Sequence, residues 1–282
     1  RLAGAERERG THYNFRTPAG CAEALLSPNM ATRYLAWTRL NGLQRDAEKP
    51  LKAIWATGEP RMRARALQLL ARIKGRTDTY LKESIADRDP DIRITGLRVA
   101  RELKSDVVAR VRKLQNDSSP QVRRECAIAL RHNSASAASA IWAELAAQYQ
   151  AGDRWYLEAL GIGADRQWDS FLAAWLARVG GKWNTPAGRE IVWRSRAKKT
   201  PELLAAILRD INLTGADRTR YFRAFDFLTG PEKQAALLAI LKESNSSSTV
   251  VLEVLNRLRG VNLESNPEVA AGIRRAMPAS SA

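Results

Sequence analysis

Acidic residues stand close to tryptophans at two places in the second half of the chain. Asp153 precedes Trp155 by two residues, and Trp168 is followed directly by Asp169. An aromatic ring can stack on a base or a sugar, and a carboxylate beside it could then act on the stacked group. The alternative is a structural role, in which Asp153 caps a helix and Trp155 packs in the core. We favour the structural interpretation, because aromatic residues at helical spacing usually fill a core.

Other residue types that carry chemistry are few. The chain has two cysteines, Cys21 and Cys126, and two histidines, His12 and His132. The sequence contains no Cys-x-x-Cys, no haem-binding Cys-x-x-Cys-His and no phosphate-binding Gly-x-x-x-x-Gly-Lys-Ser/Thr. No histidine stands near a serine or cysteine nucleophile with an acid, so a hydrolase triad is unsupported. We expect no catalytic residue, no metal ligand and no cofactor site in this chain; Cys126 is expected to be a small buried residue, with a regulatory thiol as the alternative.

Four prolines divide the first half of the chain into units of similar length. Their spacings are 32, 30 and 30 residues, and an apolar residue follows each proline by two positions. A proline suits the first turn of a helix, and further apolar residues continue at helical spacing. A period of this size predicts a solenoid of helical hairpins, in which each unit buries its apolar face against its neighbours. The four prolines are Pro28, Pro60, Pro90 and Pro120.

The repeat unit resembles the HEAT repeat. The segments from Asp87 to Arg93 and from Asp117 to Arg123 both read Asp-x-x-Pro-x-Ile/Val-Arg. In HEAT proteins this aspartate and this arginine form a ladder between neighbouring repeats, so the resemblance implies a structural role for these four residues. Aligned on its proline, the first copy has Ala31 where the arginine would stand, and we interpret that copy as a terminal, capping repeat.

The second half loses the proline register but keeps amphipathic segments separated by Gly, Pro and Ser clusters. The fold is therefore predicted to be all-α, an α-solenoid of HEAT-like helical hairpins. We expect a linker or remnant of a preceding domain at 1–20, regular repeats at 21–133, degenerate repeats continuing the same solenoid at 134–276, and a flexible end at 277–282. No apolar run is long enough to span a membrane.

The charge of the chain is strongly basic, with 46 Lys and Arg against 30 Asp and Glu. The segment 61–131 holds 18 of the basic and 9 of the acidic residues, which favours an acidic partner. The alternative is that many of these arginines are ladder or solvated residues. As partner-contact residues on the inner helices and loops, the sequence suggests Arg61, Arg65, Arg98, Arg101 and Arg124.

Two stretches resemble one family beyond the generic repeat. They run from Leu26 to Trp37 and from Gly152 to Ala164, and they are similar to the HEAT region of the bacterial PVC-type haem-binding-domain proteins, often labelled membrane-bound dehydrogenases. That resemblance implies a β-propeller before the repeats and a cytochrome c domain after them, and a periplasmic or cell-envelope location. Haem c would then belong to the parent protein, outside this chain. The segment from Gly10 to Gly20 is similar to the last propeller strand and its exit linker.

The sequence therefore predicts a non-catalytic scaffold that holds a protein partner or neighbouring domains of a larger dehydrogenase-like protein. The alternative is a DNA-binding protein similar to the HEAT-like alkylpurine DNA glycosylases, which combine a basic face, tryptophans and a catalytic aspartate. Under that alternative the segment 61–131 would grip DNA and a damaged base would lie near Trp155. A HEAT-type lyase or chaperone for a chromophore-bearing protein is a third class, without specific support.

Overall fold

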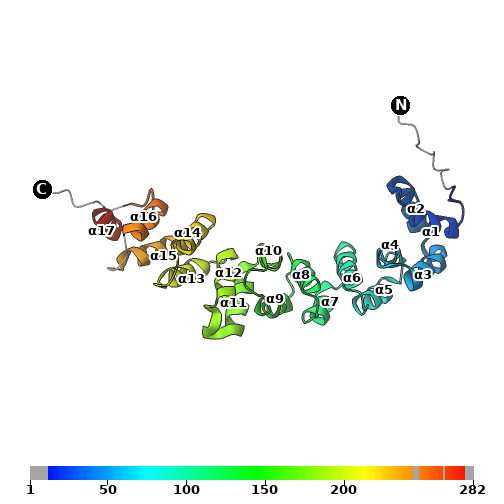
Figure 1. Cartoon of the computed structure of the whole chain (residues 1–282), viewed down its shortest axis with the longest axis horizontal. Helices are drawn as coiled ribbons and strands as arrows, with labels where there is room; N and C mark the ends of the chain where they lie inside the picture. Colours follow the sequence, from blue (N-terminus) through cyan, green and yellow to red (C-terminus); the bar gives the residue numbers. More distant parts are fainter. Residues whose placement is uncertain (1–11, 244–247, 263, 277–282) are drawn as a thin grey trace, which may run out of the picture. The chain divides into compact units, whose positions relative to one another are not determined.

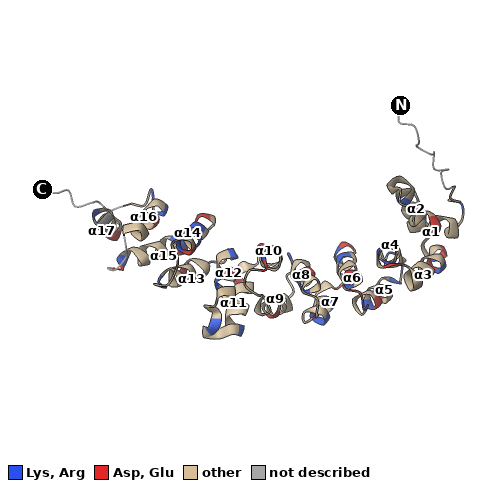
Figure 2. Cartoon of the chain, viewed as in Figure 1, with Lys and Arg blue, Asp and Glu red and all other residues tan. Residues whose placement is uncertain are grey.

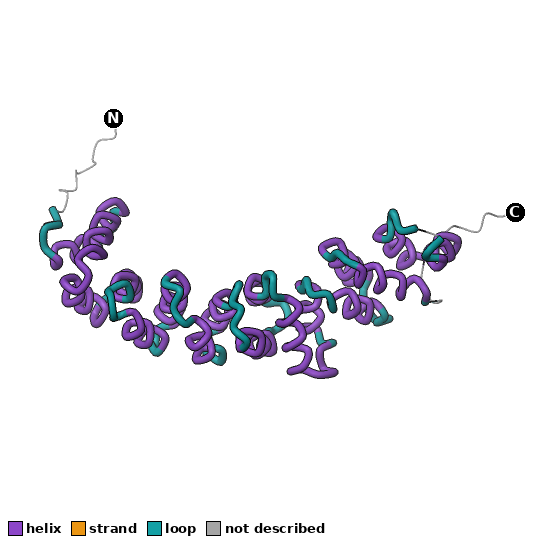
Figure 3. Tube along the Cα trace, turned by 180° about the vertical axis from the view of Figure 1, so that it is seen from behind, coloured by secondary structure: helices purple, strands orange, loops and turns teal. Residues whose placement is uncertain are grey.

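A computed structural model of the chain describes residues 12–243, 248–262 and 264–276. Within these ranges the regular structure is helical and no strand occurs (Figure 3), which confirms the predicted all-α solenoid class. No described helix combines the length and the apolar character that crossing a membrane requires. The chain divides into two compact units, 1–129 and 130–282 (Figure 1).

The first unit is a stack of four helical hairpins. Helices α1 and α2, α3 and α4, α5 and α6, and α7 and α8 pack pairwise, and α2, α4, α6 and α8 contact one another in that order. Leucines and other aliphatic residues fill the space between the hairpins, and each such buried side chain contributes about 2 kcal/mol. The helices are α1 (Pro18–Leu25), α2 (Met30–Leu43), η1 (Gln44–Ala47), α3 (Glu48–Thr57), α4 (Pro60–Leu70), α5 (Thr77–Ile85), α6 (Pro90–Glu102), α7 (Val107–Leu114) and α8 (Pro120–Ala129).

Three of the four repeat prolines stand at the first position of a helix, in α4, α6 and α8. Pro28, the first of the four in the chain, does not, because α2 begins two residues after it, at Met30. The side chain of Asn29 caps this helix by accepting a hydrogen bond from the Thr32 N–H at 3.1 Å. The prediction that every repeat proline opens a helix was therefore wrong for the first copy, because an asparagine cap there replaces the proline start.

The second unit continues with helical pairs of less regular length. Helix α9 packs on α11, α10 on α12, α13 on α15 and α15 on α17. Its helices are α9 (Ala137–Ala147), α10 (Arg154–Gly163), α11 (Trp168–Val179), η2 (Gly180–Trp183), α12 (Pro186–Arg194), α13 (Thr200–Leu208), α14 (Gly215–Ala224), η3 (Phe225–Phe227), α15 (Pro231–Lys242), α16 (Ser248–Arg257) and α17 (Pro267–Ala276).

The segment 10–20, which is similar to a propeller strand and linker, is only partly described. Its first two residues lie outside the described residues, 12–17 form loop and turn, and Pro18–Gly20 already belong to α1. Gly20 is required there, since a Cβ would come within 2.2 Å of the Asn14 carbonyl oxygen. The predicted flexible end, 277–282, lies outside the described residues. That the two halves continue one solenoid stays a prediction.

Candidate functional site

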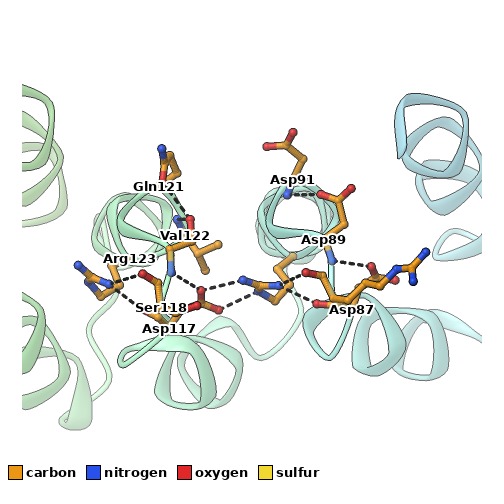
Figure 4. Close-up of polar contacts among 11 residues, drawn as sticks. Asp87, Asp89, Asp91, Asp117, Ser118, Gln121, Val122 and Arg123 are labelled. Atoms are coloured by element: carbon orange, nitrogen blue, oxygen red, sulfur yellow. Dashed lines mark hydrogen bonds and ion pairs between the residues drawn. The ribbon is translucent and has the colours of Figure 1, made fainter. Parts of the chain in front are cut away.

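A ladder of arginines and aspartates joins successive hairpins of the first unit. Arg63 donates to Asp87. Nη2 of Arg93 donates to Asp117 at 2.8 Å, and Nε of Arg93 lies 2.8 Å from the other oxygen of that carboxylate. Figure 4 shows the loops that carry Asp87 and Asp117. Each aspartate also accepts the N–H of the residue two positions on, which fixes its loop. The ladder residues are therefore occupied with one another, and their geometry is that of a structural element.

The arginines of this ladder repeat every 30 residues, starting with Arg33. Arg33, Arg93 and Arg123 each donate to the carbonyl oxygens six and five residues before them. The first copy therefore does carry the arginine, two positions later than the alignment on Pro28 placed it, because α2 also starts two residues later. No aspartate stands 24 residues after Arg33; Thr57 occupies that position.

The ladder makes the stability of the first unit sensitive to acid. Burial would raise the pKa of Asp87, but hydrogen bonds from Arg63 and the Asp89 N–H, with the charges of Arg63 and Arg88, hold that pKa below its ordinary value. A group with a lowered folded pKa stabilises the protein above its unfolded pKa, about 3.9 for aspartate, and this stability is lost as the pH falls through the folded pKa.

We therefore expect the free energy of unfolding to fall below about pH 4, and Asp87→Asn to make this fall shallower. Urea unfolding followed by circular dichroism at pH 5 and pH 3 measures both slopes. An unchanged slope in Asp87→Asn would contradict the assignment to this carboxylate.

Several of the arginines predicted to contact a partner are engaged within the unit. Arg98 donates to Glu125 at 2.8 Å, and Arg101 lies 3.7 Å from the other oxygen of the same carboxylate. Arg124 lies half-buried on α8. Figure 2 shows both basic and acidic segments on α6. Since Arg98 and Arg101 belong to α6 and Glu125 belongs to α8, these ion pairs join consecutive hairpins. For Arg98 and Arg101, these contacts agree with the alternative stated in the sequence analysis, that many of the arginines have a structural role within the repeats.

The other two predicted arginines lie where the charge is not balanced. Helices α2 and α4 contain five arginines and no acidic residue. Burial lowers the pKa of Arg65, and the charges of Arg33 and Arg61 lower it further. Arg65 donates to the Leu25 carbonyl oxygen at 3.1 Å, and Arg61 is exposed. An excess of like charge at one place attracts an anionic group.

Large apolar side chains lie on the same pair of helices. Met30, Tyr34 and Leu35 of α2 keep 75%, 68% and 57% of their surface exposed. Met30 and Tyr34 are one helical turn apart and therefore share a face of α2. We call Met30, Tyr34 and Leu35, with Arg61 and Arg65, the α2–α4 face. The sequence analysis named its arginines but missed its apolar residues.

The tryptophan and carboxylate cluster of the second unit differs from the prediction in one respect. Trp155 does not pack in the core: 74% of its surface is exposed at the start of α10. Asp153 accepts from the Tyr156 N–H at 3.0 Å and so caps α10, and Glu158 is held by Arg154 at 2.8 Å and by Arg194 at 2.9 Å. The carboxylates beside Trp155 are thus engaged in a cap and in ion pairs.

The second tryptophan and acid pair is also structural in its contacts. Trp168 is buried and meets the ring of Trp142 edge to face, with centroids 5.8 Å apart. Asp169 accepts from the Lys198 N–H at 2.7 Å. Trp175 is buried as well. Trp142, Trp168 and Trp175 therefore pack in the core of the second unit.

Both cysteines are buried, and burial raises the pKa of the Cys126 thiol, with the charges of Asp117 and Glu125 adding to the effect. A thiol of this kind is a poor nucleophile at neutral pH. Over the described ranges, no group of three or more His, Cys, Asp or Glu residues could hold a metal ion.

Comparison with protein-family models and with curated proteins gave no match to this chain. The function must therefore be inferred from the residues and their geometry.

Proposed function

We propose that this chain is a non-catalytic helical-repeat scaffold that holds an acidic protein partner or a neighbouring domain of the same polypeptide. The observation that carries the proposal is the α2–α4 face. In a stack of repeats each hairpin covers the next one, and terminal hairpins that end a stack in water need a polar outer surface. Helix α2 instead exposes three large apolar residues, which suits a surface that another protein covers.

The charge of the same face supports an acidic partner. Arg61 and Arg65 lie on α4, which contacts the α2 helix of the apolar residues, and neither helix contains Asp or Glu. Aromatic residues, methionine and arginine are the residue types enriched in protein interfaces. The resemblance to PVC-type haem-binding-domain proteins extends the proposal: the occupant would be the preceding domain of a bacterial, haem c-containing dehydrogenase-like protein in the periplasm or cell envelope.

The reading frame on both sides of this chain tests the extended proposal directly. Strand-rich propeller repeats upstream and a Cys-x-x-Cys-His downstream would support it. A start codon immediately before Arg1 and a stop soon after Ala282 would remove the neighbouring domains, and the occupant would then be a separate protein.

Replacing Tyr34 by Ser is expected to weaken association with the occupant at least about tenfold, since truncated interface anchors cost more than 1.4 kcal/mol. The unfolding free energy should change by no more than about 0.5 kcal/mol, because the side chain is exposed. Binding is measured by titration of the separately produced neighbouring domain or partner, at several salt concentrations. Arg61→Ala should flatten the salt dependence of the association.

A matched control is Ile211→Ser, which removes an apolar side chain that is 89% exposed in the second unit. This variant should bind like the unchanged chain. Equal weakening by Tyr34→Ser and Ile211→Ser would contradict the assignment to the α2–α4 face.

A second candidate function is nucleic-acid binding, favoured by the exposed ring of Trp155, which offers a surface for stacking. The carboxylates near this ring are engaged, so binding is favoured over glycosylase chemistry. Titration of duplex DNA at several salt concentrations separates the two candidates, because phosphate contacts weaken steeply with salt. Trp155→Ala should weaken DNA binding if this second candidate holds, and should leave binding of a protein partner to the α2–α4 face unchanged.

A further inference from the structure

An open groove in the second unit has more basic than acidic residues in its lining. Its volume is about 800 Å³, within the range of small-molecule sites. Four arginines and two aspartates line it. They come from the loops that follow α8, α10 and α12, from the start of α11 and from the end of α12. The charged residues are Arg131, Asp165, Arg166, Asp169, Arg194 and Arg196.

The two aspartates of the groove are already occupied. Asp165 accepts from Arg131 at 2.8 Å and lies 3.0 Å from Nε2 of His132. Asp169 accepts from the Lys198 N–H. Both carboxylates therefore already have hydrogen-bond donors within the protein. Some N–H groups of the groove arginines, in contrast, have no acceptor among the described residues.

Arg196 and Arg194 stand side by side with donors to spare. Nη1 of Arg196 donates to three backbone carbonyl oxygens at the end of α12, which fixes the guanidinium, and the group lies 5.0 Å from the centre of the Phe227 ring. Across the described residues, Nε and Nη2 of Arg196 have no acceptor. Burial lowers the pKa of Arg196 and the charge of Arg194 lowers it further, while the charge of Glu158 acts in the opposite direction. Two cations brought together in a half-buried place are relieved by a bound anion.

Gly161 makes room for Arg194. The guanidinium of Arg194 occupies the place of the missing side chain, and a Cβ on residue 161 would lie 2.5 Å from its Cζ. Nε of Arg194 donates to Glu158 at 2.9 Å, which holds the group against α10. Arg166, exposed in the loop after α10, has no ion pair within the described chain.

We propose that this groove binds a phosphate group, free or carried by a small monoester, with Arg166, Arg194 and Arg196 as its donors. A carboxylate presents one planar edge, which a single arginine can satisfy, whereas a phosphate presents three oxygens and a charge of about −1.5 to −2 to donors from several directions. The donors here come from the loop after α10, the end of α12 and the loop after α12. Ile162 and Trp168 also line the groove and leave room for an organic group attached to the phosphate.

The test is titration calorimetry of the whole chain with inorganic phosphate and with AMP, at constant ionic strength kept with chloride. Saturable binding of either ligand is expected. Arg196→Gln and Arg166→Gln should each weaken it about tenfold, the loss expected for one hydrogen bond to a charged group. Arg209→Gln is the matched control: Arg209 lies in the same unit in an exposed ion pair with Glu243, and its loss should leave the affinity unchanged.

The two ligands separate the two sources of the phosphate. Tighter binding of AMP than of phosphate would assign the groove to a monoester, and equal binding would assign it to free phosphate; both support the site. Arg166 is exposed, so Arg166→Gln keeps the test valid even if a substitution of Arg196 disturbs the end of α12. Absence of saturable binding, equal affinity in all variants, or binding of duplex DNA alone would overturn the proposal.

Discussion

Replacing Asp117 by Ala is expected to lower the free energy of unfolding of the first unit by about 3 kcal/mol, the lower end of the cost of breaking a buried ion pair. The Asp117 side chain is only 7% exposed, and it accepts one hydrogen bond from Nη2 of Arg93 and one from the Ser119 N–H. Nε of Arg93 lies 2.8 Å from the other oxygen of the carboxylate as an ion-pair contact. Removal of the Asp117 side chain leaves the Arg93 guanidinium, itself mostly buried, without its carboxylate. Urea unfolding at pH 7, followed by circular dichroism, measures the loss.

The matched control for Asp117→Ala is Glu102→Ala in the same unit. Glu102 accepts from Arg72 at 2.5 Å, but half of its side-chain surface is exposed, and exposed pairs contribute about 0.2–1 kcal/mol. A double-mutant cycle of Asp117→Ala with Arg93→Ala should return a coupling energy well above that of Glu102 with Arg72. Similar losses in Asp117→Ala and Glu102→Ala would mean that the ladder adds nothing beyond surface pairing.

The ladder could be predicted from the sequence because its two partners belong to one repeating unit. Asp87 and Asp117 each lie in the loop before a proline-started helix, and the arginine follows in the first turn, so the same short segment carries both residues. Stacking of equal units then brings the arginine of one repeat to the aspartate of the next. In the first copy the arginine, Arg33, was not recognised from the sequence, because the helix begins after an asparagine cap rather than at Pro28.

The candidate contact surface could be predicted only in part. Whether an arginine on an inner helix stays available depends on the residue that the next hairpin places beside it. Glu125 lies beside Arg98 and Arg101, whereas the neighbours of Arg65 include Arg33 and Arg61. Charge counts along the chain do not separate these two cases, since the contact joins residues about 30 positions apart. The groove around Arg196 depends on the same kind of contact, between loops of irregular repeats without a fixed period.

The tryptophans show where helical spacing misleads. Trp155 sits at the first turn of α10, where the side chains that pack inward are Tyr156, Leu157 and Leu160. The apolar residues around it in the sequence made a core position the natural expectation. The structure instead leaves 74% of the Trp155 surface exposed, which the spacing of apolar residues in the sequence does not reveal.

Replacing Trp142 by Ala is expected to lower the free energy of unfolding of the second unit by about 4 kcal/mol, as for other large buried aromatic residues. The ring is fully buried, packs against Trp168 and Phe171 with centroids 5.8 and 5.5 Å away, and donates from Nε1 to the Leu160 carbonyl oxygen at 3.1 Å. The substitution leaves a cavity between α9 and α11 and removes one of the two hydrogen bonds to the Leu160 carbonyl oxygen, which keeps the bond from the Ala164 N–H. Urea unfolding monitored by circular dichroism gives the loss.

Trp155→Ala provides the comparison within the same unit, since it removes an equal side chain from an exposed position. Its unfolding free energy should stay within about 0.5 kcal/mol of the unchanged chain. Trp142→Phe should fall between the two, because the ring is mostly retained while the hydrogen bond to Leu160, about 1 kcal/mol, is lost. A large loss in Trp155→Ala would place that ring in a packed contact, and the surface proposed for stacking a nucleic-acid base would then not exist.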